Sequence, residues 1–325
     1  MGFFSDRSIL VTGGTGSFGQ AFIRRLLKEH APRRVVVFSR DELKQFEMQQ
    51  QLQAPNLRYF IGDVRDQARL ERAFDGIDTV VHAAALKQVV AAEYNPIECI
   101  RTNVMGAENI INAAINCGVE RVLALSTDKA VNPINIYGAT KLCSDKLFIA
   151  ANHLSGRKTA FSVVRYGNVI GSRGSVIPFF KEKRKTGKLP ITDPRMTRFW
   201  ITLEKGCQFV EQSCELMHGG EIFVPRIPSM RITDLARVMA PECEQEVVGI
   251  RPGEKLHEIL IPRDEARSTR EYDDFFVIAP SFQAWGGAGV DFPGRVGKAV
   301  SDEFEYSSDS NPQWVTDDEL KELVK

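Results

Sequence analysis

The sequence lacks an excess of charge of either sign, a long apolar run and any regular spacing of cysteines. Lysine plus arginine number 42, and aspartate plus glutamate also number 42. No overall basic field therefore favours nucleic acid as a partner. No apolar run approaches the ~20 residues that span a membrane, and the N-terminus enters an apolar strand without the layout of a signal peptide. We expect neither a nucleic-acid nor a membrane partner.

The six cysteines are scattered, without the close pairs that hold a metal or a disulfide framework. This pattern fits a reducing compartment, and we expect a cytoplasmic protein with no metal site. The chain of 325 residues is long enough for a large core and two lobes.

What the sequence does contain, close to its start, is a glycine-rich turn between a strand and a helix. Residues 8–12 form a short apolar run, and residues 20–29 carry apolar side chains at helical spacing. Between them, Gly13, Gly16 and Gly19 are three residues apart. Glycines at this spacing permit a tight turn and let the backbone approach a pyrophosphate at a helix N-terminus. The segment predicts a dinucleotide-binding fold.

The end of the second predicted strand, residues 34–39, bears on the choice between NAD and NADP. NAD-selective folds usually place an acid there to hold the ribose 2′-hydroxyl. Here Ser39 and Arg40 come first, and Lys44 follows one turn later. Two cations suit a 2′-phosphate, so we predict NADP. The acid Asp41 keeps open the alternative that both cations are merely solvated.

Further apolar segments continue the predicted parallel sheet. They are residues 59–64, 75–85, 121–126 and 160–165. Asp63 is placed to meet the adenine, and the small residues after His82 let the backbone lie against the cofactor. His82 itself is expected to be a packed residue at a strand end, whereas Lys87 is a better candidate for a phosphate or substrate contact.

The segment STDKAVNPINIYGATK, which follows the fifth predicted strand, carries most of the chemistry. Tyr137 and Lys141 share a helix face, and the Lys141 ammonium is expected to lower the phenol pKa of Tyr137 from about 10. A phenolate takes the proton from a hydroxyl whose carbon gives hydride to a nicotinamide. Asp128 and Lys129 exceed the needs of a simple dehydrogenase and indicate a second, acid–base step. With Thr127, they fall at the carboxyl end of a strand, where parallel sheets bind ligands.

The second half of the chain alternates polar blocks with short apolar segments. Its arginines are candidates to clamp a diphosphate, because a guanidinium matches phosphate geometry with paired hydrogen bonds. Ordinary surface ion pairing is the alternative. We predict an α/β fold, with a doubly wound parallel (Rossmann) sheet over residues 1–167. Residues 168–325 are expected to form a smaller mixed α/β substrate-binding lobe, with some chain crossing back to the sheet.

The glycine turn, the HAAA strand end, the YxxxK pair and the RYGNV segment together resemble the extended short-chain dehydrogenase/reductase family. Within it, the segments VFSRDELKQ, AALKQV, STDKA, MTRFW and GIRPGEKLHE are similar to those of inverting UDP-N-acetylglucosamine 4,6-dehydratases. A related membrane-anchored group typically lacks the tyrosine that stands here as Tyr137. The resemblance implies UDP-N-acetylglucosamine as substrate, NADP as cofactor and a homo-oligomer, either dimer or hexamer. It also implies a product used in pseudaminic acid biosynthesis and in surface or flagellin glycosylation.

The resemblance, added to the residue patterns, assigns three sets of site residues. The expected catalytic residues are Thr127, Asp128, Lys129, Tyr137 and Lys141. The expected cofactor contacts are Gly13, Thr15, Gly16, Ser17, Phe18, Gly19, Ser39, Arg40, Asp41, Lys44, Asp63, Val64, Ala83, Lys87, Tyr137, Lys141 and Val169. The expected substrate contacts are Lys87, Ser126, Thr127, Asn168, Arg173, Ser175, Arg195, Arg198, Arg251 and Glu254.

The implied reaction oxidises C4, eliminates water across C5 and C6, returns hydride to C6 and reprotonates C5 with inversion. Tyr137 takes the C4 hydroxyl proton, a neutral Lys129 of lowered pKa takes the C5 hydrogen, and a protonated Asp128 releases water. The sequence leaves open whether Asp128 and Lys129 exchange these roles. It also leaves a retaining dehydratase and a UDP-hexose 4-epimerase as alternatives. A non-enzymatic NADP sensor is a third, which the intact Thr127, Tyr137 and Lys141 oppose.

Overall fold

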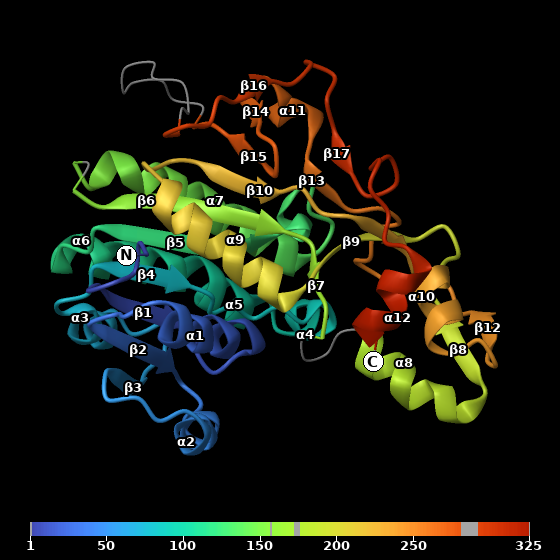
Figure 1. Cartoon of the computed structure of the whole chain (residues 1–325), viewed down its shortest axis with the longest axis horizontal. Helices are drawn as coiled ribbons and strands as arrows, with labels where there is room; N and C mark the ends of the chain where they lie inside the picture. Colours follow the sequence, from blue (N-terminus) through green and yellow to red (C-terminus); the bar gives the residue numbers. More distant parts are fainter. Residues whose placement is uncertain (1, 157, 172–175, 281–291, 325) are drawn as a thin grey trace.

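The computed structural model describes residues 2–156, 158–171, 176–280 and 292–324. Within these residues ten strands form one sheet, in the order β16-β14-β15-β10-β6-β5-β4-β1-β2-β3 (Figure 1). The strands from β3 to β10 run parallel, and β15, β14 and β16 add to that edge antiparallel. The strand order reverses at β1, as in doubly wound folds. The predicted fold class is confirmed.

The parallel strands are apolar and largely buried, as expected where helices cover both faces of a sheet. They are β1 (Ser8–Thr12), β2 (Arg34–Ser39), β3 (Leu57–Ile61), β4 (Thr79–His82), β5 (Arg121–Thr127), β6 (Ala160–Tyr166) and β10 (Ile222–Pro225). The antiparallel strands are β14 (Thr269–Glu271), β15 (Phe275–Ile278) and β16 (Lys298–Ala299).

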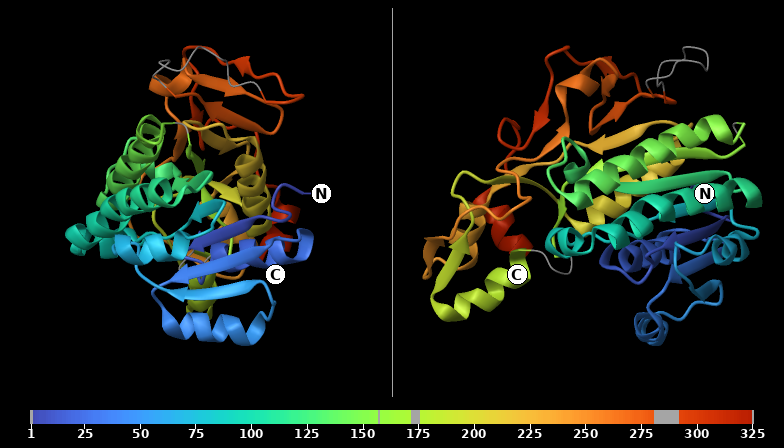
Figure 2. Two further views of the ribbon diagram at one scale, coloured as in Figure 1. Left: turned by 90° about the vertical axis from the view of Figure 1, so that its left-hand side faces the viewer. Right: turned by 180° about the vertical axis from the view of Figure 1, so that it is seen from behind.

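Helices cover both faces of this sheet. Helices α3 (Gln67–Phe74), α6 (Gly106–Cys117) and α7 (Ile136–Leu154) pack side by side on one face. Helices α1 (Ser17–Glu29) and α9 (Leu203–Leu216) pack together on the other, and Figure 2 shows the sheet between the two layers. The remaining elements near the sheet are α2 (Glu42–Gln51), α4 (Val89–Tyr94), α5 (Pro96–Ile100), the π-helical turn η1 (Arg101–Met105), η2 (Asp128–Ala130) and α11 (Arg263–Ala266).

A smaller lobe lies beyond the carboxyl ends of the parallel strands, at the right of Figure 1. It has its own apolar core, to which Phe180, Leu189, Leu235 and Leu320 contribute. Its elements are α8 (Val176–Lys183), η3 (Arg184–Thr186), β8 (Lys188–Ile191), α10 (Ile232–Met239), β12 (Glu244–Val247) and α12 (Asp317–Val324). Two small sheets adjoin it, formed by β7 (Asn168–Val169), β9 (Thr197–Ile201) and β11 (Ser229–Arg231), and by β13 (Ile259–Ile261) and β17 (Tyr306–Ser307).

The chain crosses between these two parts more than once. Strand β10 comes from the second half of the chain yet pairs in parallel with β6 of the first half. After residues 229–247 contribute to the smaller lobe, β14, β15 and β16 return to the large sheet. Among the described residues, no helix combines the length and apolar character needed to cross a membrane.

Candidate active site

A cleft of about 800 Å³ runs along the carboxyl ends of the parallel strands and reaches the smaller lobe. Its lining includes the turn between β1 and α1, the ends of β2 and β4, the start of α7 and residues 251–255. Each residue predicted to contact the cofactor lines this cleft. Strand ends far apart in the sequence thus form one continuous surface.

The glycine turn at one end of the cleft is shaped for close backbone approach. Gly13 has a φ of +64°, and a Cβ there would come within 2.9 Å of the Ala84 nitrogen. A Cβ on Gly19 would meet the Gly13 carbonyl at 2.6 Å. Gly16 caps α1 without a side-chain hydrogen bond. Gly16 has no side chain to occupy the start of α1, which fits a pyrophosphate at the helix N-terminus.

The end of β2 forms the next part of the cleft. The Ser39 hydroxyl lies 2.8 Å from the Thr15 hydroxyl, which joins the glycine turn to the second strand. Lys44 forms an ion pair with Asp41, and Arg40 lies 3.6 Å from Asp63. Both predicted 2′-phosphate ligands thus reach the cleft, and each shares its charge with an acid.

Tyr137 stands at the start of α7 and faces the middle of the cleft. Asn135 caps this helix by accepting from the Gly138 amide at 2.8 Å, and its own amide donates to the Gly253 carbonyl at 2.8 Å. Burial raises the pKa of the Tyr137 phenol to about 12, against the opposing effects of the Lys129 ammonium and a hydrogen bond with Thr127. The cap fixes the phenol in the cleft and ties it to the loop before β13.

Lys141 does not have the effect on Tyr137 that the sequence predicted. Its ammonium donates to the main-chain carbonyl of Leu125 at 2.8 Å. Burial lowers the pKa of Lys141, opposed by the Asp145 carboxylate, which also accepts from Ser126 at 2.7 Å. In this structure the cation that lowers the phenol pKa is Lys129.

The turn η2 delivers Asp128 and Lys129 directly after β5. One Asp128 oxygen, Oδ1, accepts from the Thr127 hydroxyl at 3.0 Å and from the Lys129 ammonium at 2.9 Å. The other oxygen, Oδ2, is buried and has no hydrogen-bond partner among the residues that the structure describes. Asp128 is 0% exposed and does not line the cleft, whereas Thr127 and Lys129 on either side of it do. Asp128 therefore lies behind the cleft wall, hydrogen-bonded to Thr127 and Lys129, which both face the cleft.

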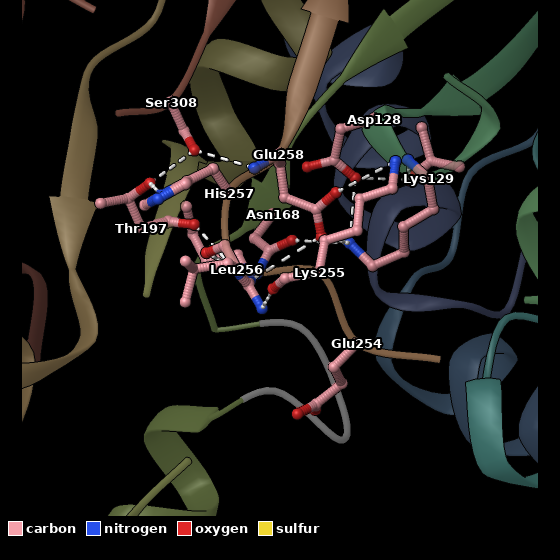
Figure 3. A network of polar contacts seen from close by, with 12 residues as sticks. Asp128, Lys129, Asn168, Thr197, Glu254, Lys255, Leu256, His257, Glu258 and Ser308 are labelled. Carbon is pink, nitrogen blue, oxygen red and sulfur yellow. Dashed lines mark hydrogen bonds and ion pairs between the residues drawn. The ribbon is translucent and has the colours of Figure 1, made fainter. Parts of the chain in front are cut away.

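The protonation of Lys129 differs from the sequence prediction, which required a lowered pKa. Burial alone would lower the pKa of Lys129, but the carboxylates of Asp128 and Glu258 outweigh burial and raise it. Glu258 lies 3.4 Å from the Lys129 ammonium, and the Asn168 side-chain oxygen accepts from it at 3.3 Å (Figure 3). Lys129 is therefore a cation held between two acids.

Glu258 and Lys255 are site residues that the sequence analysis did not single out. Both line the cleft, and Lys255 lies 3.9 Å from Glu258. The sequence feature that could have revealed them is the charged block RPGEKLHE. From this block the sequence analysis took only Arg251 and Glu254 as substrate contacts. Nothing in the sequence spacing placed its last residue against Lys129, more than a hundred positions earlier.

The predicted arginines are placed very differently. Arg251 and Arg198 line the cleft, with Glu254 beside Arg251 at 3.9 Å. The Arg198 guanidinium is largely engaged, since it donates to the main-chain carbonyls of Thr197, Lys255 and Leu256. Arg195 is exposed, pairs with Asp193 at 2.8 Å and does not line the cleft, so the structure does not support it as a clamp. Arg173 and Ser175 lie outside the described residues.

Two further buried polar residues hold the cleft wall in shape. The His82 ring nitrogen Nδ1 lies 2.8 Å from the Thr12 hydroxyl, and burial lowers the pKa of His82 to about 3. This supports the prediction of a packed histidine. Asn103, in the turn η1, bonds to both the amide and the carbonyl of Leu86 and donates to Thr140 at 3.0 Å. It thereby joins the loop after β4 to the helix that carries Tyr137.

Comparison with known proteins agrees with this arrangement. A family model described as "Polysaccharide biosynthesis protein" matches residues 9–280. The chain is 54% identical to the "UDP-N-acetylglucosamine 4,6-dehydratase (inverting)" of Campylobacter jejuni, over 99% of this chain and 98% of that protein. It is 44% identical to the "UDP-glucose 4-epimerase" of Rickettsia conorii, over 85% and 83% of the two chains. The solved structure of Pen from Bacillus thuringiensis matches with a TM-score of 0.89 and 37% identity, over 99% and 98% of the chains.

The sheet, the glycine turn and the Tyr137–Lys141 pair define a Rossmann-type protein of the short-chain dehydrogenase/reductase class. More particularly, the chain belongs to the polysaccharide biosynthesis protein family, within the extended branch of that class.

Proposed function

We propose that this protein is an NADP-dependent UDP-N-acetylglucosamine 4,6-dehydratase that inverts C5. The carrying observation is that Tyr137, Lys141 and Lys129 line one cleft, and that Asp128 forms an ion pair with Lys129 directly behind the cleft wall. The Tyr137–Lys141 pair suits oxidation of a carbinol, and the ion pair suits removal of water from the neighbouring carbons. The 54% identity to an inverting dehydratase of this substrate supports the same reading.

Different parts of the cleft suit different parts of the two ligands, the dinucleotide and the sugar nucleotide. The glycine turn and the α1 N-terminus would hold the pyrophosphate of the dinucleotide, and Ser39, Arg40 and Lys44 its adenosine end. Arg251, at the far end, suits the diphosphate of the sugar nucleotide. When bound, a nicotinamide supplies a hydride acceptor for C4 and later a hydride donor for C6. The chain's own residues then handle the protons.

Tyr137 takes the proton from the 4-hydroxyl, which Thr127 orients. The resulting 4-ketone makes the C5 hydrogen acidic, and Lys129, which lines the cleft, takes that hydrogen. Because Lys129 rests as a cation, it must first release a proton. Transfer of one proton across the 2.9 Å Lys129–Asp128 hydrogen bond yields a neutral amine and a carboxylic acid together. These are the two forms that the elimination requires, the acid releasing the 6-hydroxyl as water.

The product is a 4-keto-6-deoxy sugar nucleotide, of β-L-arabino configuration when C5 is reprotonated from the opposite face. The substrate and product are water-soluble nucleotides, which fits a cytoplasmic enzyme that supplies a glycan pathway of the pseudaminic acid type. We further expect the working enzyme to be a homo-oligomer, a dimer or hexamer, testable by light scattering of the purified protein.

The decisive experiment is proton NMR of the purified enzyme with UDP-N-acetylglucosamine and NADP⁺ in D₂O. We expect a new C6 methyl signal, deuterium at C5 and couplings of an L-sugar. A methyl product with retained C5 geometry would make the protein a retaining dehydratase. A product with an intact C6 hydroxymethyl and an altered C4 would make it a 4-epimerase. Tight NADP binding without turnover would make it a sensor.

A further inference from the structure

Glu258 is a buried acid in the cleft for which the dehydratase scheme above has no use. Its side chain is 2% exposed, and it directly precedes β13, which packs against the catalytic turn η2. A buried carboxylate is costly unless cations and hydrogen bonds compensate it. A buried carboxylate beside Lys129 is therefore expected to have a function.

The surroundings of Glu258 hold it in one place. Its amide donates to the Ser308 hydroxyl at 2.9 Å, and its carbonyl accepts from the Ser308 amide at 2.8 Å. The Ser308 hydroxyl lies 2.7 Å from that of Thr197. Figure 3 shows this support on the side of Glu258 away from Lys129. The main chain is thus fixed from behind, and the carboxylate projects toward the catalytic turn.

The carboxylate is shared among cations of unequal proximity. Oε1 lies 3.4 Å from the Lys129 ammonium and 3.8 Å from the Arg198 Nε, and Oε2 lies 3.9 Å from the Lys255 ammonium. Oε2 is buried and accepts no hydrogen bond among the described residues. Lys129 is the nearest cation, so the charge of Glu258 acts most strongly on Lys129.

We propose that Glu258 is a positioning residue for Lys129: together with Asp128 it brackets the amine and stabilises the ammonium that forms when Lys129 takes the C5 hydrogen. This inference rests on the proposed function. In that step the C5–H bond breaks, its electron pair moves toward the C4 ketone, and the proton forms a new N–H bond on Lys129. Asp128, having given its proton to the leaving hydroxyl, is again an anion, so two carboxylates then face the new cation.

The other charged groups around Lys129 either lower its pKa or affect it less than Asp128 and Glu258 do. Arg198 lowers the pKa of Lys129. Burial lowers the pKa of both Lys87 and Lys255, and the Lys129 ammonium acts in the same direction on each. The phenol of Tyr137 lies near the same ammonium. Among the described residues, loss of Glu258 leaves Asp128 as the one carboxylate within 4 Å of the Lys129 ammonium. With these cations nearby, the pKa of Lys129 must then fall.

The first test needs no turnover. Enzyme labelled with ¹³C at lysine Cε is titrated by NMR, and the Lys129 signal is assigned with Lys129→Met. We expect Glu258→Gln to lower the pKa of Lys129 by at least about one unit, since an opposite charge at this distance shifts a pKa by about 1–3 units. Glu258→Asp keeps the carboxylate but moves it away from Lys129 by the length of one methylene. It should lower the pKa of Lys129 by less than Glu258→Gln does. Glu211→Gln, on α9 and paired with Arg25 away from the cleft, is the matched control and should give none.

The second test separates the steps of the reaction. Glu258→Gln should slow deuterium incorporation at C5 at least about tenfold while changing C4 oxidation much less, because only the former uses Lys129 as base. Glu258→Asp should restore part of the exchange. An unchanged Lys129 pKa in both Glu258 variants would overturn the proposal, as would equal loss of both steps. Absence of a methyl product from the unaltered enzyme would instead remove the proposed function and leave the titration result standing.

Discussion

The ammonium of Lys141 donates to the main-chain carbonyl of Leu125 at 2.8 Å, although Lys141 lies one helical turn from Tyr137 on α7. The pair therefore shares a helix face without sharing a hydrogen bond in this structure. Lys141 instead ties α7 to strand β5, whose end delivers Thr127. Its first effect is to fix the distance between the phenol and the catalytic turn.

Replacing Tyr137 by phenylalanine should remove C4 oxidation and leave the cleft intact. We expect a loss of about 100- to 10,000-fold, the usual contribution of a positioned base, with little change in NADP affinity. Single-turnover formation of the reduced cofactor, followed by absorbance, measures this. Tyr59→Phe on β3 is the control, because its hydroxyl donates to the Leu52 carbonyl and lies outside the cleft. Substantial oxidation by Tyr137→Phe would show that another group takes the hydroxyl proton.

The same phenol predicts a pH dependence. Burial raises the pKa of Tyr137 to about 12, and the Lys129 ammonium opposes this. The phenolate is the active form, so the rate of C4 oxidation in the first turnover should rise as pH rises above neutrality. Lys129→Met removes the opposing cation, so this rising limb should move to higher pH. A limb that moves to lower pH, or does not move, would contradict the assignment.

Replacing Lys129 by alanine should stop the second step and spare the first. Deuterium incorporation at C5 should fall about 100- to 10,000-fold, while hydride transfer from C4 continues. NMR of the recovered sugar nucleotide in D₂O measures both. Lys28→Ala, in the last turn of α1, is a matched loss of one lysine away from the cleft. Full dehydratase activity in Lys129→Ala would show that Lys129 is not the C5 base.

His82 should make the fold sensitive to acid. Burial lowers its pKa from 6.5 to about 3, so below pH 6.5 the unfolded chain binds a proton that the folded chain does not. Stability from this residue is complete above the unfolded pKa and falls as pH drops toward 3. The slope is about 1.4 kcal/mol per pH unit, or about 3 kcal/mol between about pH 7.5 and about pH 4.5.

Urea unfolding of the enzyme and of His82→Asn at these two pH values checks the prediction. The variant should lose less free energy of unfolding on acidification than the unaltered protein, whatever its absolute stability. His218→Asn, an exposed histidine, should behave as the unaltered protein does. Equal acid sensitivity in His82→Asn would show that other groups control it.

Cofactor choice should depend on Arg40 and Lys44. If they hold a 2′-phosphate, the double variant Arg40→Ala, Lys44→Ala should weaken NADPH binding about 10-fold or more and leave NADH nearly unchanged, because charge-assisted contacts contribute about 1.5–3 kcal/mol each. Fluorescence titration with both reduced cofactors measures this. Equal weakening of NADPH and NADH binding in the double variant would favour NAD as the cofactor. Tighter binding of NADH than of NADPH by the unaltered enzyme would do the same.

The parallel sheet and the cofactor end of the cleft could be predicted because their signals are local. Gly13, Gly16 and Gly19 sit between a strand and a helix in sequence as in space, and β1, β2 and β6 begin where expected. Protonation states could not be predicted in this way. The pKa of Lys129 depends on Glu258, which reaches it through the pairing of β13 and β17. Arg195 lies outside the cleft and pairs with its neighbour in sequence, Asp193, which the spacing of polar residues did not indicate.

The return of β10 to the side of β6 has a consequence for the order in which the protein can be made. Until residues 222–225 emerge from the ribosome, β6 is an edge strand: one side pairs with β5, and the backbone groups on its other side have no strand partner. Unpaired edges of this kind invite aggregation. The growing chain therefore carries its vulnerable edge throughout synthesis of α8, β8 and α9, and chaperone contact should concentrate in that interval.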